Sequence, residues 1–228
     1  MTRPLEGRTA LVTGGVKRVG LAIARAIAAA GARVIVTSRE DASDEFETIN
    51  VDLSTHEGVD SLLAQLPAVD LLVNSAANFI RQPFGSITYD NFDATFALNV
   101  RAPLFLSQAL GGAMASRGFG RIVNIADVAA TIPFPAWLPY SMGKAATVAL
   151  TKGLAKALAP HVLVNAVAPG PVLLPEHLSD EDAENAIAPT VLKRPGRAED
   201  VANAVVFLLS SDYITGVTLP VDGGRLLR

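Results

Sequence analysis

The sequence predicts a doubly wound α/β domain, in which helices cover both faces of a parallel sheet of about seven strands. Short runs rich in β-branched residues alternate with helix-like segments along the whole chain. These runs are apolar at consecutive positions, which is typical of strands buried on both faces. No linker, repeat or low-complexity tract interrupts the alternation, so we expect one domain over residues 1–228.

The elements can be located in order along the chain. A first strand is expected at Thr9–Thr13, and a helix follows over Arg18–Ala30 because Val19, Ile23 and Ile27 share one helical face. The later strands are expected at Arg33–Thr37, Glu47–Val51, Asp70–Asn74, Arg121–Ile125, Val162–Ala168 and Val217–Val221. The later helices are expected at Thr55–Leu66, Tyr89–Ser116, Tyr140–Ala159 and Arg197–Ser210.

A proline-rich stretch, Pro169–Pro189, follows the sixth strand as an insertion. In doubly wound sheets, ligands bind outside the carboxyl ends of the strands, where the strand order reverses. We therefore expect this insertion to serve as a lid over a substrate.

Composition excludes several classes of function. A net charge of −3 without a basic block argues against nucleic-acid and anionic-membrane partners. The absence of cysteine excludes disulfides and a thiolate nucleophile, and it fits a reducing, cytoplasmic compartment. No signal peptide or membrane-spanning run is expected. The three histidines share no metal-ligand spacing, so no metal site is expected: His56, His161 and His177.

A glycine-rich turn joins the first strand to the first helix, from Thr13 to Gly20. Glycines allow the backbone to turn tightly and approach a diphosphate, and the helix N-terminus supplies free N–H groups. This strand–turn–helix context predicts dinucleotide binding. Lys17 and Arg18 place two cations at the anion-binding end, where we expect a phosphate contact.

The second strand ends in Ser38 and Arg39, a hydroxyl and a guanidinium suited to a phosphate monoester. A carboxylate at this point would instead bind the ribose hydroxyls of NAD. The sequence therefore favours NADP(H), while Glu40 and Asp41 leave NAD as an alternative.

Tyr140 and Lys144 lie four residues apart at the start of a predicted helix, so their side chains share one face. A tyrosine with a pKa of about 10 is a poor acid–base catalyst near neutral pH. A nearby cation lowers that pKa. We therefore expect Tyr140 to be the proton donor and Lys144 to lower its pKa.

Asn99 falls on the buried stripe of the helix that contains Phe92, Phe96 and Pro103, so its side chain must find hydrogen-bond partners. Pro103 has no N–H to give to the carbonyl four residues back, which belongs to Asn99. The sequence predicts a free backbone acceptor there, bound to water.

Together these motifs resemble the short-chain dehydrogenase/reductase family over essentially the whole chain. The resemblance implies that the glycine turn binds the cofactor, although Arg18 stands where the family usually has glycine. It implies an anchor for the nicotinamide ribose at Lys144 and a water held by Asn99 in a proton relay to that lysine. The remaining cofactor residues that it implies are Thr13, Gly14, Val19, Gly20, Asp52, Leu53, Asn74, Ser75, Ala76, Tyr140, Pro169 and Gly170.

One position departs from the common family pattern. Asp127 stands thirteen residues before the tyrosine, where most members have a serine, and a carboxylate donates a hydrogen bond only when protonated. The pteridine and dihydrofolate reductase subgroup has this substitution, together with an arginine in the glycine turn. In that subgroup a phenylalanine at the position of Phe79 stacks on the pterin. The tail Asp222–Arg228 is also similar, whereas Ser75–Ala77 departs from the subgroup.

The resemblance implies a Rossmann-type oxidoreductase with a cofactor half at roughly 1–120 and a catalytic half at roughly 121–228. We expect NADPH-dependent reduction of a pterin or dihydrofolate C=N bond, with Asp127, Tyr140, Lys144 and Asn99 as catalytic residues. A general carbonyl or 3-oxoacyl reductase is the alternative, and a non-catalytic NADP-binding sensor is a third possibility. The resemblance also implies a homotetramer.

Overall fold

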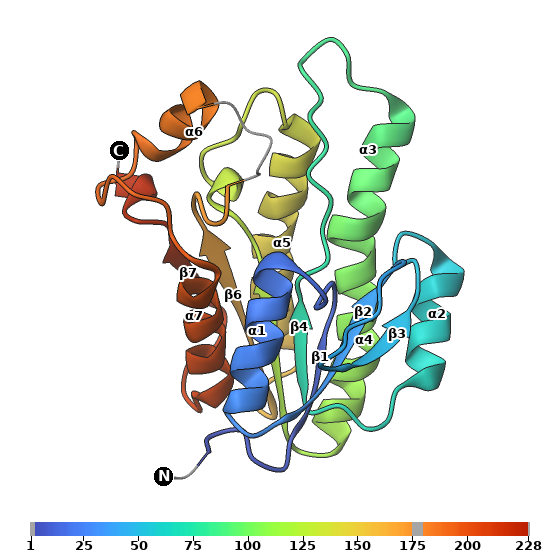
Figure 1. Ribbon diagram of the computed structural model, residues 1–228. Coiled ribbons are helices and arrows are strands. Elements are labelled where there is room, and N and C mark those ends of the chain that lie inside the picture. The colour runs from blue at the N-terminus through green and yellow to red at the C-terminus, as the bar shows by residue number, and fades with distance from the viewer. Residues whose placement is uncertain (1–2, 175–179, 228) are drawn as a thin grey trace.

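The computed structural model describes residues 3–174 and 180–227, and its seven described strands form one parallel sheet (Figure 1). The strand order is β3-β2-β1-β4-β5-β6-β7, so the order reverses between β1 and β4. The expected doubly wound parallel sheet is confirmed. The strands are β1 Thr9–Val12, β2 Arg33–Ser38, β3 Glu47–Asn50, β4 Leu71–Asn74, β5 Gly120–Ile125, β6 Val162–Pro169 and β7 Thr218–Val221.

Helices cover both faces of the sheet (Figure 1). One face carries α1 (Arg18–Ala29) and α7 (Ala198–Ser210), and the opposite face carries α2 (His56–Gln65), α4 (Ala102–Ser116) and α5 (Leu138–Ala157). The further described elements are α3 Tyr89–Phe96, α6 Asp180–Ile187, and the short helices η1 Ala97–Arg101, η2 Val128–Ala130 and η3 Arg225–Leu227.

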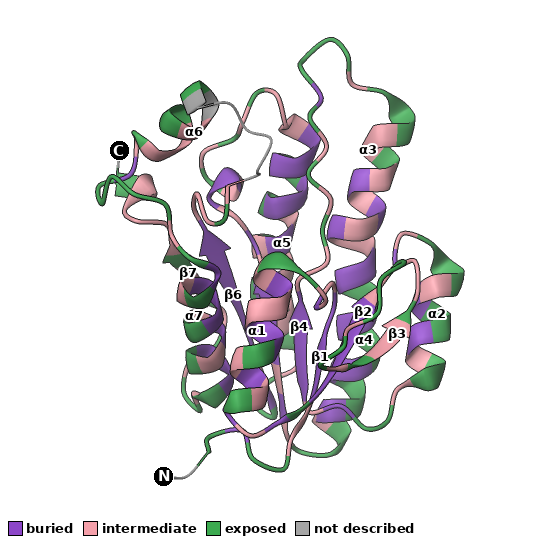
Figure 2. Ribbon diagram, in the orientation of Figure 1, coloured by how far each residue is buried: buried purple, intermediate pink, exposed green. Residues whose placement is uncertain are grey.

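The apolar strands are buried on both sides, as their composition predicts. In β1, Ala10 and Val12 pack into the cluster beneath α1 and α7, whereas Leu11 packs into the cluster beneath α4. All three side chains are inaccessible to solvent, and Figure 2 shows the central strands as buried. Burial of this apolar area holds the layers together and fixes the carboxyl edge of the sheet on which the site is built.

Two expected segments differ from the structure. The single helix expected at Tyr89–Ser116 is interrupted by a π-helical turn, η1, because Pro103 removes an N–H from the helical ladder. The insertion Pro169–Pro189 contains the helix α6, a short acidic segment that was not expected to be helical. Positions 175–179 of that insertion lie outside the described residues.

Within the described part of the chain, no helix combines the length and the apolar composition needed to cross a membrane.

Candidate active site

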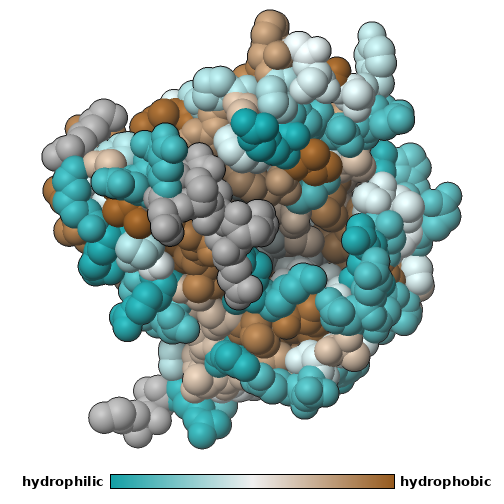
Figure 3. Space-filling model, turned by 45° about the horizontal axis from the view of Figure 1, so that its top comes forward, coloured by the Kyte–Doolittle hydropathy of each residue, from teal (hydrophilic) through white to brown (hydrophobic). Residues whose placement is uncertain are grey.

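The predicted site residues gather at the edge of the sheet where β1, β4, β5 and β6 end. The glycine turn follows β1, Asn74–Ala76 closes β4, Asp127 follows β5, and Pro169 ends β6. Because all four strands are parallel, these segments meet at one edge. Figure 3 looks onto this side of the molecule, where hydrophobic side chains lie near the centre and hydrophilic ones surround them.

The glycine turn packs its backbone against the chain after β4. Gly14 has a φ of +65°, and a Cβ added to it would lie 3.0 Å from the Ala76 Cα. A Cβ on Gly20 would lie 2.1 Å from the Gly14 carbonyl oxygen. Thr13 Oγ1 accepts hydrogen bonds from the Ser75 and Ala76 N–H groups, at 2.9 and 3.0 Å. The turn therefore requires glycine at these two positions.

Helix α1 begins directly after this turn, and Lys17 at its N-cap makes no side-chain capping bond. The N–H groups of a first helical turn have no partner within the helix. Together with backbone space that only glycine leaves open, they form a cradle that fits a diphosphate. Two of the cofactor residues that the family resemblance implies also pack into the hydrophobic core: Val19 and Leu53.

The two cations of the turn reach different partners. The Lys17 ammonium lies 3.3 Å from the Asp41 carboxylate, and both side chains are exposed. Arg18 has a positive φ of 53°, and its guanidinium donates to the Leu173 carbonyl in the chain after β6. Arg18 therefore connects the glycine turn to the start of the insertion.

The end of β2 presents the residues expected to choose the cofactor. Arg39 pairs with Glu40 at 3.1 Å, and the Ser38 hydroxyl accepts from the Asp41 N–H at 3.1 Å. Hydrogen bonds from Ser54 lower the pKa of Asp52, and the Arg39 charge lowers it further. Both carboxylates that favour NAD in the sequence are thus engaged by Lys17 or Arg39.

Asn74 belongs to a buried polar chain that links the sheet to two helices. Its Nδ2 donates to Ser107 Oγ at 3.1 Å and to Asn124 Oδ1 at 2.8 Å. Asn124 in turn donates to Thr151 Oγ1 at 2.9 Å. Asn74 thus joins β4 to β5 and to α4, whereas Ser107, Asn124 and Thr151 were not identified from the sequence. The polar Asn124 among the apolar residues Ile122, Val123 and Ile125 was the available signal.

The residues that are expected to transfer protons lie together. The Tyr140 hydroxyl donates to Asp127 Oδ2 at 2.8 Å, and the Ala129 N–H donates to Asp127 Oδ1 at 2.8 Å. The Lys144 ammonium donates to the Ile125 carbonyl at 2.7 Å and lies 5.5 Å from the centre of the Tyr140 ring. Tyr140 and Lys144 are both buried.

Burial dominates the acid–base behaviour of this group. It raises the pKa of Tyr140 well above its ordinary value, and the Asp127 carboxylate raises it further. It also raises the pKa of Asp127, against the opposing effects of the Ala129 N–H and the Lys144 charge. Burial lowers the pKa of Lys144 to about 8. The pKa of Tyr140 is therefore raised and not lowered as expected, because desolvation and the Asp127 carboxylate both act in that direction.

Asn99 lies in the π-helical turn and is buried, as its place on the apolar stripe predicts. Its Oδ1 accepts from the Asn78 N–H at 3.0 Å, and its Nδ2 donates to the Asn78 carbonyl at 3.1 Å. A Cβ on Gly143 would lie 3.4 Å from the Asn99 Cβ, so α5 packs closely on this turn. Asn99 therefore fixes the chain after β4, and the water relay through its carbonyl stays a prediction.

Phe79 lies directly beside Tyr140. Its ring meets the Tyr140 ring edge-on at 4.7 Å and stacks on Trp137 at 5.1 Å, with 8° between the planes. Phe79 is 51 % exposed, so it is an available aromatic surface and not a core residue. Trp137 was missed in the sequence, where nothing placed it opposite Phe79.

The tight turn after β6 fits the C-terminal chain. A Cβ on Gly170 would lie 2.7 Å from the Asp222 Cα, so this glycine permits the backbone contact between the ends of β6 and β7. Among the described residues, no cluster of three or more histidine or acidic side chains could hold a metal ion. His177 lies outside the described residues.

Comparison with known proteins gives consistent matches over the whole chain. The profile of the family described as Enoyl-(Acyl carrier protein) reductase matches residues 15–225. The L-xylulose reductase of Bos taurus is 39 % identical over 97 % of this chain and 98 % of its own. A crystal structure of a putative betaketoacyl-ACP reductase is 38 % identical, covers 98 % of this chain and 100 % of its own, and superposes with a TM-score of 0.91. The FolM Alternative dihydrofolate reductase 1 from Brucella canis, complexed with NADP, is 28 % identical with a TM-score of 0.89, covering 100 % of this chain and 97 % of its own.

Proposed function

Because the chain belongs to the short-chain dehydrogenase/reductase family of NAD(P)-dependent oxidoreductases, we propose that it uses NADPH to reduce the carbonyl group of a small molecule. The observation that carries this proposal is the 2.8 Å hydrogen bond between Tyr140 and Asp127, with Lys144 buried beside it. The names of two relatives support a ketone as the reacting group, since xylulose and β-ketoacyl thioesters both contain one.

The cofactor cradle is assigned to the glycine turn and the end of β2. Gly14 and Gly20 leave the backbone open to the diphosphate, and Ser38 and Arg39 are suited to the 2′-phosphate. Lys144 is assigned to the nicotinamide ribose, and the chain at Pro169–Gly170 to the nicotinamide. When bound, the nicotinamide supplies the hydride.

The proton comes from Tyr140. Its raised pKa keeps the phenol protonated at neutral pH, so it is a donor in the resting protein. The phenolate left after proton transfer is stabilised by the Lys144 charge, which is present below a pH of about 8. In its acid form Asp127 donates a hydrogen bond, which supplies the donor that a serine gives in most family members.

Reduction of a pterin or dihydrofolate C=N bond is the second candidate. Two observations favour it: the half-exposed Phe79 beside Tyr140, and a carboxyl group in place of the usual serine. A pterin ring stacked on Phe79 would gain about 0.5–1.5 kcal/mol beyond the burial of its area. The NADP-bound dihydrofolate reductase among the similar structures supports this candidate.

A substrate panel tests the proposal. NADPH consumption is measured in parallel with L-xylulose, a small α-dicarbonyl, an acetoacetyl thioester, dihydrobiopterin and dihydrofolate. We expect turnover with a ketone and a lower rate with the pterins. Fast reduction of the pterins, together with no turnover of the ketones, would favour pterin reduction over carbonyl reduction. Tight NADPH binding without turnover of any compound would leave only a cofactor-binding sensor.

The proposal includes self-association as a tetramer. Large apolar side chains stand exposed on α4 and α5: Leu104, Phe105 and Met142. Contact between copies would cover them. Sedimentation velocity at micromolar concentration distinguishes a monomer from the tetramer.

A further inference from the structure

The surface beside Tyr140 is aromatic and carries a cation. The ring of Phe79 meets the Tyr140 ring edge-on at 4.7 Å and stacks on Trp137 at 5.1 Å. The Arg81 guanidinium lies over the ring of Trp137, 5.7 Å from its centre. Each of these side chains lies beside the next, so the series leads from the proposed proton donor to a permanent positive charge.

Two backbone segments hold this surface in place. The Gln82 N–H donates to the carbonyl that precedes Trp137 at 2.7 Å, and Gln82 pairs with Trp137 in a parallel bridge. Exposure alternates along residues 79–82: Phe79 and Arg81 are exposed, whereas Ile80 is half-buried and Gln82 is buried. This alternation is typical of an extended chain with one face toward solvent, so Phe79 and Arg81 share the outer face.

The spacing of Phe79 and Arg81 suits a small planar molecule. Residues two apart in an extended chain are separated by about 6.5–7 Å. A substrate with its planar part on Phe79 and its carbonyl group at Tyr140 would therefore bring a substituent on the far side of that part to Arg81. A para-disubstituted benzene ring places its two substituents about this far apart.

Arg81 has its hydrogen-bond donors available. Among the described residues, none forms a salt bridge with it, whereas the exposed Arg25 and Arg33 each pair with a glutamate. Stacking on Trp137 positions the guanidinium through the face of the indole ring and uses none of its N–H groups. The planar fork of a guanidinium matches the two oxygens of a carboxylate.

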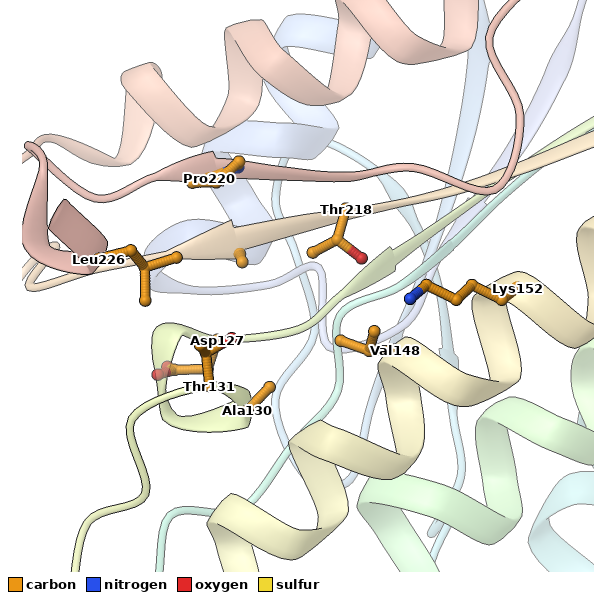
Figure 4. Close-up of a pocket in the computed structure, with 9 residues that line it drawn as sticks. Asp127, Ala130, Thr131, Val148, Lys152, Thr218, Pro220 and Leu226 are labelled. Atoms are coloured by element: carbon orange, nitrogen blue, oxygen red, sulfur yellow. The ribbon is translucent and has the colours of Figure 1, made fainter.

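A second cation, Lys152, lines a cavity of about 270 Å³ whose wall also includes Asp127 (Figure 4). Neither Tyr140 nor Phe79 lines that cavity. A ligand bound there would not contact the aromatic surface beside the proton donor. We therefore assign the recognition of a charged substrate to Arg81 and not to Lys152.

Asp127 also borders Tyr140, and its charge would oppose an anionic substrate. Burial raises the pKa of Asp127, which reduces the fraction that is ionised. The positive charges of Lys144 and Arg225 act on Asp127 from two other elements and offset the charge that remains. The repulsion that a substrate carboxylate meets is therefore weakened.

Resting on the proposed function, we propose that the substrate is a carboxylate whose charged group is bound by Arg81 while its planar, carbonyl-bearing part lies on Phe79. The hydride goes to the carbonyl carbon and the Tyr140 proton to the carbonyl oxygen, and the carboxylate is left unchanged. Arg81 is thus a specificity-determining residue and takes no part in proton transfer. The same placement applies to the second candidate, since dihydrofolate carries carboxylates and dihydrobiopterin carries none.

Two ketones of one shape test the proposal: para-acetylbenzoate and para-acetylbenzamide, which differ in the charge of the group opposite the ketone. We expect a higher kcat/KM of the wild type for the carboxylate. Arg81→Gln should lower that value roughly three- to tenfold through KM and leave the amide unchanged. Arg81→Lys keeps the charge without the planar fork and should retain part of the preference. Added salt should narrow the preference of the wild type.

Arg33→Gln is the matched control. It removes the same charge from an exposed arginine at the first residue of β2, at the opposite edge of the sheet. Its ratio of kcat/KM for the carboxylate over the amide should equal that of the wild type. An unchanged ratio in Arg81→Gln, or an equal fall in Arg33→Gln, would overturn the role of Arg81.

A binding measurement needs no turnover. Trp137 is the single tryptophan of the chain, so its fluorescence reports on ligands at this surface. In the presence of NADP⁺, para-acetylbenzoate should quench the wild type at lower concentration than para-acetylbenzamide, and Arg81→Gln should lose this difference. Equal binding of both compounds by the wild type, or binding of neither, would overturn the proposal. Preferential binding of the carboxylate by a protein that reduces nothing on the panel would reject the proposed function and retain Arg81 as the residue that binds the anion.

Discussion

At the scale of single residues, the proposed chemistry depends on three ionisable side chains. Tyr140, Asp127 and Lys144 share a buried space in which each charge is costly. Burial keeps the Tyr140 phenol protonated at neutral pH, and the hydrogen bond that it donates to Asp127 acts in the same direction. The resting protein is therefore prepared to donate a proton, which is the direction of reduction.

Removing the phenol tests this assignment. Tyr140→Phe should reduce turnover by about a hundredfold or more, since a positioned general acid contributes roughly 10²–10⁴ in rate. NADPH affinity, measured by fluorescence titration, should stay close to wild type, because the glycine turn and the end of β2 are unchanged. A variant that keeps most of its rate would contradict the role of Tyr140.

The lowered pKa of Lys144 predicts that activity falls on the alkaline side of the pH profile. Lys144 is charged below a pH of about 8 and loses its proton as the pH rises through that value. Because the charge is needed to stabilise the phenolate and hold the ribose, kcat/KM for NADPH should fall above a pH of about 8. Lys144→Arg stays charged, so whatever activity it retains should lack this limb. A limb that persists in Lys144→Arg belongs to another group.

The sequence predicted that the candidate residues lie together, but not the electrostatic balance among them. Tyr140, Lys144 and Asp127 were found from spacing and resemblance, and the structure brings them together. The direction in which the pKa of Tyr140 shifts was not predicted. Spacing along a helix places two side chains on one face but does not reveal how deeply they are buried. Trp137 was missed for a related reason, since its stacking on Phe79 joins two loops far apart in the sequence.

At the scale of elements, the π-helical turn η1 holds the chain after β4 in place. It carries Asn99, which makes two hydrogen bonds to the backbone of Asn78. The chain after β4 is held by this side chain, and it presents Phe79 to Tyr140. Pro103 made the defect foreseeable, whereas the partner of the Asn99 side chain depended on tertiary packing.

Asn99→Ala should therefore loosen that chain. Leaving a buried N–H and carbonyl of Asn78 unpaired costs about 1–3 kcal/mol, which urea unfolding would measure as a lower midpoint at unchanged slope. The substrate KM should rise because Phe79 loses its support. Asn99→Asp keeps the acceptor for the Asn78 N–H but places a carboxylate oxygen against the Asn78 carbonyl in a buried site, so it should be at least as destabilising. Equal stability of Asn99→Ala and wild type would contradict this bracing role.

At the scale of the whole molecule, the alternation of apolar strands and helices was sufficient to predict the sheet and its two helical layers. It was not sufficient for α6, whose exposed acidic sequence packs little apolar surface. The elements that could be predicted are those whose buried faces produce a recognisable pattern of apolar residues in the sequence. Those that could not are held by contacts with distant parts of the chain, such as the Arg225 hydrogen bond to Ala186.

Binding of the cofactor at the edge of the sheet joins segments from most of the chain, so its effect should be read in global stability. At about one hundred times its Kd, NADPH should stabilise the fold by roughly 2.7 kcal/mol. For a chain of this size, that raises Tm by roughly 5–10 °C. The proposed contact of Arg39 with the 2′-phosphate would be a charge-assisted hydrogen bond worth about 1.5–3 kcal/mol, or tenfold or more in Kd.

NADH at the same concentration should therefore give about half the shift in Tm or less. Arg39→Ala should reduce the NADPH shift to the NADH level and leave the NADH shift unchanged, because only the 2′-phosphate distinguishes the two cofactors. Differential scanning fluorimetry of both proteins with both cofactors provides the four values needed. The Tm of unliganded Arg39→Ala is the control, and it should match wild type because the Arg39–Glu40 pair is exposed. An equal loss of stabilisation by both cofactors would show that Arg39 shapes the end of β2 and does not read the phosphate.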